Sequence, residues 1–148
     1  MTLRLPELNH IKMIMQKRHL LSLLCLLLLA SALFAACSNQ DGSDPAAAVE
    51  TYLSAMVAND TARRPQLICP VYEAGAQTDF DSMGAVSGAA LNGVDCTAGA
   101  VNGDSATVTC TGSIDFTYNG ENQSLDLTTN RYLAQKVDGE WKMCGYQQ

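Results

Sequence analysis

The fold is decided by residues 105–118, which read SATVTCTGSIDFTY. Apolar or small residues alternate there with Ser, Thr and Asp, and the first set comprises Ala106, Val108, Cys110, Gly112, Ile114, Phe116 and Tyr118. A period of two places the two sets on opposite faces of a β-strand, one toward the core and one toward water. The segment therefore predicts a long, half-buried antiparallel strand.

Turn signals divide the rest of this region into further strands. Asn102-Gly103, Asn119-Gly120 and Asp138-Gly139 tolerate the positive φ that tight hairpins need. They predict four antiparallel strands in a meander, at about residues 91–100, 105–118, 123–137 and 140–147. Because these strands exceed the usual five or six residues, we expect a bent or bulged sheet.

Helix signals precede the strands. Asp44 suits an N-cap and Pro45 the first helical position. Apolar residues then recur at helical spacing, namely Val49, Tyr52, Leu53, Met56 and Val57. Asn59-Asp60 is expected to end this helix, and Thr61 to cap a short successor before Pro65. Phe80, Met83 and Val86 have the spacing of another short helix.

Helices followed by antiparallel strands predict an α+β fold, with N-terminal helices packed on a curved four-stranded meander sheet. Two segments, AVETYL at residues 48–53 and GEWKMC at residues 139–144, give the chain a resemblance to a known family. Over residues 45–147 it resembles the nuclear-transport-factor-like family, also called ketosteroid-isomerase-like or cystatin-like. It looks most like the secreted lipoprotein members, for which the resemblance implies no common activity.

Enzymes of that family use an acid and a tyrosine on the concave side of the sheet. The residues that invite this comparison here are Tyr52, Tyr118, Tyr132, Asp115 and Asp126. None of them aligns to a motif of the family, so no catalytic residue is assigned. Asp115 falls on the hydrophilic face of its strand, where a solvated carboxylate is the simpler interpretation.

The N-terminal segment has the pattern of an export signal. Basic residues, from Arg4 to Arg18, precede an apolar run at residues 20–34, which small residues end. A membrane-spanning helix needs about 20 residues, more than this run supplies. Residues 33–37 read LFAAC and resemble the lipobox of bacterial lipoproteins, with Phe34 in place of the usual leucine. We therefore expect Cys37 to be the lipidated first residue of the mature protein.

Cysteine parity favours this interpretation over cleavage at the competing site Ala30-Ser31-Ala32. Cleavage after Ala32 would leave five cysteines in an oxidising compartment, whereas lipidation of Cys37 leaves an even four: Cys69, Cys96, Cys110 and Cys144. Four cysteines allow three pairings. A hairpin near Asn102-Gly103 places Cys96 opposite Cys110, and Cys69 would then join Cys144. A zinc site is disfavoured because no C-x₂-C pair is present.

Charge and composition limit the partners. From Cys37 onward 14 acidic residues stand against 5 basic ones, a net charge of −9, which repels phosphate backbones and disfavours nucleic acid as a partner. Both histidines, His10 and His19, lie in the signal segment, so the mature chain lacks the commonest general base and metal ligand. We expect no metal and no cofactor.

The sequence thus predicts three segments: a lipoprotein signal peptide at 1–36, a lipidated cysteine and polar tether at 37–44, and an α+β domain at 45–148. Acyl chains on Cys37 would attach the domain to the membrane of a bacterial cell envelope, outside the cytoplasm. The favoured hypothesis for its function is a binding or interaction module, with a structural spacer and a carboxylate-dependent isomerase or hydrolase as alternatives. An acid with a raised pKa beside a tyrosine in an apolar cavity would favour the enzyme, and a solidly packed interior would exclude it.

Overall fold

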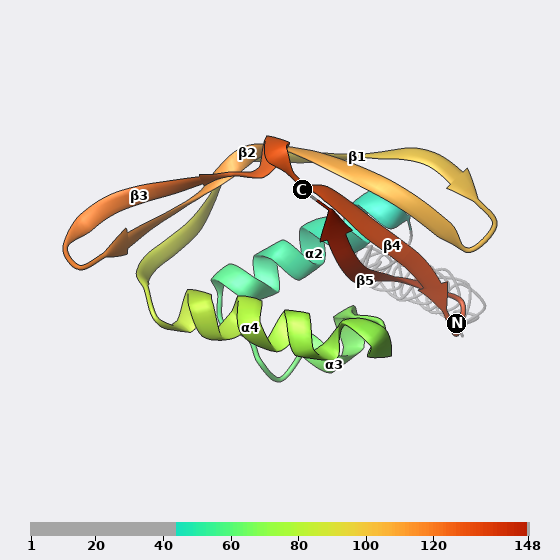
Figure 1. Ribbon diagram of the computed structural model, residues 1–148, viewed down its shortest axis with the longest axis horizontal. Helices are drawn as coiled ribbons and strands as arrows, with labels where there is room; N and C mark the ends of the chain where they lie inside the picture. Colours follow the sequence, from blue (N-terminus) through green and yellow to red (C-terminus); the bar gives the residue numbers. More distant parts are fainter. Residues whose placement is uncertain (1–43, 148) are drawn as a thin grey trace, which may run out of the picture. The chain divides into compact units, whose positions relative to one another are not determined.

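The described part of the chain is residues 44–147 of a computed structural model (Figure 1). The expected signal peptide, the lipidation site Cys37 and the tether up to residue 43 lie outside it. Within residues 44–147, no helix has the length and apolar character to span a bilayer.

Helices come first in the described segment. They are α2 (Pro45–Val57), α3 (Arg64–Leu67), the 3₁₀ turn η2 (Pro70–Tyr72) and α4 (Glu73–Gly84). The prediction for α2 is confirmed: the Asp44 carboxylate accepts hydrogen bonds from the backbone N–H groups of Ala46 and Ala47, at 2.8 and 2.9 Å.

The predictions for the next two helices are partly wrong. Pro65 lies inside the first turn of α3, where its missing N–H is not needed, and Arg63 rather than Thr61 is the N-cap residue. Helix α4 ends at Gly84, so Val86 lies beyond its end.

The strands are β1 (Ser87–Asn102), β2 (Ser105–Tyr118), β3 (Glu121–Asp126), β4 (Arg131–Val137) and β5 (Glu140–Gln147). All their pairings are antiparallel, in the order β1-β2-β4-β5, and β3 pairs with the end of β2 that β4 leaves free. The α+β class is confirmed, but the described sheet has five strands instead of four.

The expected single strand at 123–137 is broken by a 3₁₀ turn, η3 (Leu127–Thr129). The Asp126 carboxylate accepts hydrogen bonds from the Thr128 backbone N–H at 2.9 Å and from the Thr128 hydroxyl at 2.8 Å. These local bonds offer the backbone an alternative to strand pairing, so β3 ends where the turn begins.

Two of the three turn predictions are confirmed residue by residue. Asn119 and Gly120 have φ of 53° and 83°, and Asp138 and Gly139 have φ of 54° and 88°. In the first hairpin the loop is shifted by one residue, because Asn102 pairs with Ser105 and only Gly103 and Asp104 lie between them.

Bulges bend the sheet, as the strand lengths predict. The β1–β2 ladder changes register at three places, and the β4–β5 ladder changes between Leu133 and Ala134. Gly112, with φ of 86°, lies opposite one bulge, where a Cβ would come within 2.5 Å of the Gly93 carbonyl oxygen. Only glycine allows the two strands to approach so closely.

Helices α2 and α4 lie on one side of the long β1–β2 hairpin (Figure 1). Helix α2 buries Val49, Tyr52, Leu53 and Met56 against sheet residues that include Val108, Ile114 and Met143. The α4 contribution to this core is Ala76 and Phe80, both fully buried.

The structure places the four cysteines in the two expected pairs. Cys96 pairs with Cys110 across the β1–β2 hairpin at a Cα–Cα distance of 4.0 Å, and Cys69 pairs with Cys144 at 4.9 Å. The second disulfide links the segment between α3 and η2 to β5, and the Cys69 N–H donates to the Met143 carbonyl at 2.8 Å.

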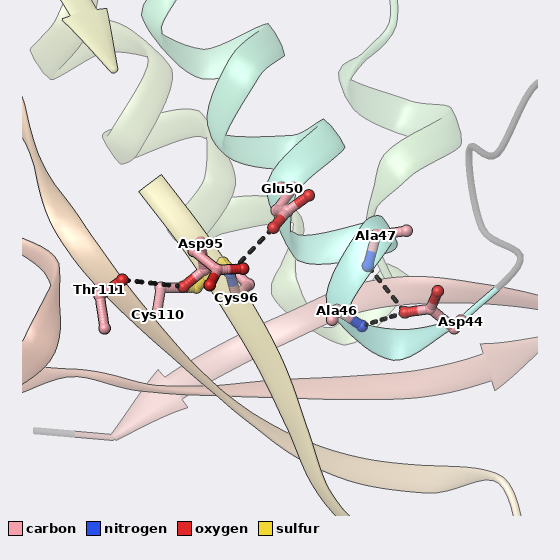
Figure 2. The surroundings of a disulfide bond; sticks show 8 residues. All are labelled: Asp44, Ala46, Ala47, Glu50, Asp95, Cys96, Cys110 and Thr111. Carbon is pink, nitrogen blue, oxygen red and sulfur yellow. Dashed lines mark hydrogen bonds between the residues drawn. A yellow bond between two sulfur atoms is a disulfide. The ribbon is translucent and has the colours of Figure 1, made fainter. Parts of the chain in front are cut away.

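Figure 2 shows how α2 also reaches the first disulfide. A Glu50 carboxylate oxygen accepts a hydrogen bond from the Cys96 backbone N–H at 2.9 Å. Because β1 is an edge strand, this carboxylate covers an N–H that faces away from β2. With its own core and two disulfides, the described segment has what an independently folding domain needs.

Candidate functional site

A cavity of about 220 Å³ opens between the helices and the sheet. Its lining residues are Tyr52, Leu53, Met56, Asp79, Ser82, Met83, Ile114, Leu125, Leu127, Asn130, Tyr132 and Tyr146, and we call it the Asp79 pocket. A 150 Å³ apolar cavity is known to admit benzene, so the Asp79 pocket has room for a somewhat larger molecule.

The carboxylate of Asp79, on α4, accepts hydrogen bonds from three tyrosine hydroxyls. Tyr52 on α2 and Tyr72 in η2 both donate to Oδ2, at 2.7 and 2.6 Å. Tyr146 on β5 donates to Oδ1 at 3.2 Å. Elements from both the helical layer and the sheet thus converge on one carboxylate.

Aromatic contacts extend this arrangement into a chain of four rings, which we call the tyrosine cluster: Tyr52, Tyr72, Tyr146 and Tyr132. Neighbouring ring centroids in it lie 6.2, 6.1 and 6.2 Å apart. Tyr52 also meets Phe80 edge-on at 5.8 Å, which fixes its ring in the core.

The environment keeps these phenols protonated. Burial raises the pKa of Tyr52 and of Tyr72 well above the ordinary tyrosine value, and the hydrogen bond to Asp79 and its negative charge raise both further. Burial likewise raises the pKa of Tyr132 and of Tyr146. The four phenols therefore serve as hydroxyl donors and aromatic surface rather than as bases.

The rest of the pocket wall is mostly apolar. The aliphatic and methionine side chains in it are Leu53, Met56, Met83, Ile114, Leu125 and Leu127. Two methionines give part of this wall an adaptable surface. A polar end built on Asp79 and an apolar wall are the usual composition of a small-molecule site.

Two of the residues singled out from the sequence, Tyr52 and Tyr132, do line this pocket. The others lie elsewhere: Tyr118 is about half exposed at the end of β2, and Asp126 caps η3. Tyr118 and Asp126 therefore do not form the acid–tyrosine pair that enzymes of the resembled family use.

Asp115 lies in a separate, open hollow on the sheet. Its carboxylate accepts hydrogen bonds from Asn92 Nδ2 at 2.8 Å, Ser113 Oγ at 2.9 Å and Ser124 Oγ at 2.6 Å. These bonds hold the pKa of Asp115 below its usual range. The hollow is mostly polar and lacks the apolar wall of the Asp79 pocket.

Sequence reasoning missed Asp79, Tyr72 and Tyr146. A signal for Asp79 exists, because it lies three residues after Ala76 and four before Met83 and so adjoins the apolar face of α4. An acid beside a buried helix face needs a partner, and the three tyrosines supply it. Within residues 44–147, no group of three or more His, Cys, Asp or Glu side chains is placed to hold a metal ion.

The sequence matches no protein-family model and no curated protein. Among solved structures, a SEC-C motif containing protein from Rhodopseudomonas palustris is similar over 68% of this chain and 75% of its own, with 17% identity and a TM-score of 0.50. An NTF2-like protein with a cystatin-like fold from Novosphingobium aromaticivorans is similar over 78% and 82%, with 18% identity and a TM-score of 0.40. The similarity to the first structure shows a shared fold and nothing more. The TM-score of the second structure is too low to support a conclusion.

Proposed function

We propose that the chain is a lipid-anchored, extracytoplasmic protein of nuclear-transport-factor-like architecture that binds a small molecule in the Asp79 pocket. The anchor is supported by the apolar run and the small residues that precede Cys37. The architecture is supported by α2, which packs against a bulged antiparallel sheet.

The single observation behind the binding function is the pocket itself, an apolar cavity with one hydrogen-bonded carboxylate at its polar end. Residues that only stabilise the fold do not need about 220 Å³ of open space beside them, since interiors are otherwise close-packed. A structural spacer would need no such cavity.

The neutral probe 2-phenylethanol tests this function on residues 38–148, by isothermal titration calorimetry. Ser82 is an exposed residue of the pocket lining, so Ser82→Trp should obstruct the cavity and remove saturable binding. Ser54→Trp is the matched control, because Ser54 is exposed on α2 and lies outside the lining. Equal binding by both variants, or absence of saturable binding of this probe and of its charged analogues to the unmodified domain, would contradict the proposal.

A second candidate, a carboxylate-dependent isomerase, is favoured by the contact between Asp79 and Tyr52 in this cavity. The protonated phenols leave Asp79 as the base available there. Exchange of the α-protons of 4-phenyl-2-butanone in deuterated buffer, followed by NMR, tests it. An isomerase should accelerate the exchange over buffer and lose this effect in Asp79→Asn; exchange at the buffer rate would eliminate this candidate.

A further inference from the structure

The Asp79 pocket contains a negative charge that no described residue neutralises. Asp79 is the one charged residue of its lining. Within residues 44–147 it forms no ion pair with a lysine or arginine, since its partners are tyrosine hydroxyls, whereas Glu73 at the start of the same helix pairs with Arg64 at 3.1 Å. Neutral donors leave the charge of the carboxylate in place.

The hydrogen bonds of Asp79 also leave room for another donor. A carboxylate offers about four acceptor positions on its two oxygens. Tyr52 and Tyr72 occupy Oδ2, while Oδ1 has only the 3.2 Å bond from the exposed Tyr146. The acceptor position left for another donor is therefore on Oδ1 of Asp79, and Asp79 lines the cavity.

Aromatic side chains line the same cavity. Tyr52, Tyr132 and Tyr146 line it together with Asp79. The negative face of an aromatic ring attracts a cation within about 6 Å, more strongly when the cation is partly desolvated. A cavity that contains a carboxylate and is lined by tyrosine rings is therefore a more favourable environment for an ammonium group than for an anion.

We propose that the ligand of the Asp79 pocket is a small organic cation, whose ammonium group donates a hydrogen bond to Asp79 Oδ1 and whose apolar body lies against Leu53, Met83 and Leu127. This inference rests on the proposed binding function and names its ligand class. Scaled from the 150 Å³ cavity that admits benzene, the pocket suits about nine non-hydrogen atoms. The acidic surface of the mature chain would concentrate such a cation near the site.

The test compares three probes of similar size that differ in their polar group: 2-phenylethylammonium, 2-phenylethanol and phenylacetate. Dissociation constants are measured by calorimetry on residues 38–148 at pH 7 and low salt. Charge-assisted hydrogen bonds are about twice as strong as neutral ones, so the ammonium should bind about tenfold more tightly than the alcohol. Phenylacetate should bind at least about tenfold more weakly than the alcohol, because its charge opposes that of Asp79.

Asp79→Asn keeps the shape of the side chain and removes the charge, so it should reduce the affinity for the ammonium to that for the alcohol. Asp115→Asn is the matched control, because Asp115 also accepts three hydrogen bonds but lies outside the pocket. This control should leave the preference for the ammonium unchanged.

The outcomes separate this inference from the binding function. If the alcohol binds and the ammonium binds no more tightly, or if Asp79→Asn and Asp115→Asn behave alike, the cationic ligand is wrong while the binding function stands. If no probe binds the unmodified domain, the binding function itself fails. The three-probe comparison on the unmodified domain decides the question even if Asp79→Asn does not fold.

Discussion

Replacing Tyr52 by phenylalanine should lower the free energy of unfolding by about 1.5–3 kcal/mol. The Tyr52 hydroxyl donates to Asp79 at 2.7 Å from a side chain that is 1% exposed. A hydrogen bond to a charged group contributes about 1.5–3 kcal/mol. Tyr146→Phe is the matched control: its bond to Asp79 is 3.2 Å long and its side chain is 40% exposed, so the loss should stay below about 0.5 kcal/mol.

A double-mutant cycle with Asp79→Ala separates this bond from other effects of the substitution. The Tyr52–Asp79 coupling energy should be about 1.5–3 kcal/mol, and the Tyr146–Asp79 coupling energy below about 0.5 kcal/mol. Urea unfolding of residues 38–148, followed by circular dichroism, gives both values. Equal losses of stability for Tyr52→Phe and Tyr146→Phe, or no coupling between Tyr52 and Asp79, would refute the hydrogen bond that holds the Asp79 carboxylate at the polar end of the pocket.

Three other predictions concern the phenols, the disulfides and the anchor. Because the pKa values of Tyr52 and Tyr72 are raised above the ordinary value of about 10, the stability they contribute is complete below that pH and is lost as pH rises beyond it. The phenolate absorbance of the domain in excess of that of Tyr52→Phe should therefore appear only together with loss of the circular dichroism signal, and earlier ionisation of Tyr52 in the folded chain would contradict its burial. Replacing Cys69 and Cys144 by alanine should lower the free energy of unfolding by about 4.5 kcal/mol, and replacing Cys96 and Cys110 should lower it by about 3 kcal/mol. The first disulfide closes a loop of 75 residues and the second a loop of 14, so the first restricts the unfolded chain more. The reverse order of the two losses in urea unfolding would contradict this prediction. Intact mass of the full chain expressed in a bacterium should show diacylglycerol on Cys37 and its loss in Cys37→Ser, whereas a chain beginning at Leu33 would overturn the anchor.

Local patterns in the sequence are enough to predict α2, β2 and two of the three hairpin turns. The alternation over residues 105–118 corresponds to β2, Ser105–Tyr118, at both ends. Asp44 and Pro45 begin α2 as expected, since a cap and a fixed φ act within one turn. The break at Leu127–Thr129 was missed because the Asp126 side chain competes with strand pairing inside an otherwise strand-like stretch.

The site could not be predicted in the same way, because it depends on contacts between distant residues. Asp79 and Tyr146 lie 67 residues apart in the sequence. Strict alternation along β5 would place Tyr146 on the face opposite to Met143. The bulge beside Gly145, whose φ is 131°, changes this register and brings Tyr146 opposite Tyr132, within reach of α4.

Ligand binding in the Asp79 pocket is the central property proposed for this protein. Backbone amide chemical shifts of residues 38–148, recorded by NMR during titration with 2-phenylethylammonium, test this directly. We expect the largest changes around the pocket-lining residues Leu53, Met83 and Leu127, and the smallest at Asn92, Thr117 and Asn122, which line the Asp115 hollow alone. Changes centred on the Asp115 hollow, or spread thinly over the surface, would contradict it.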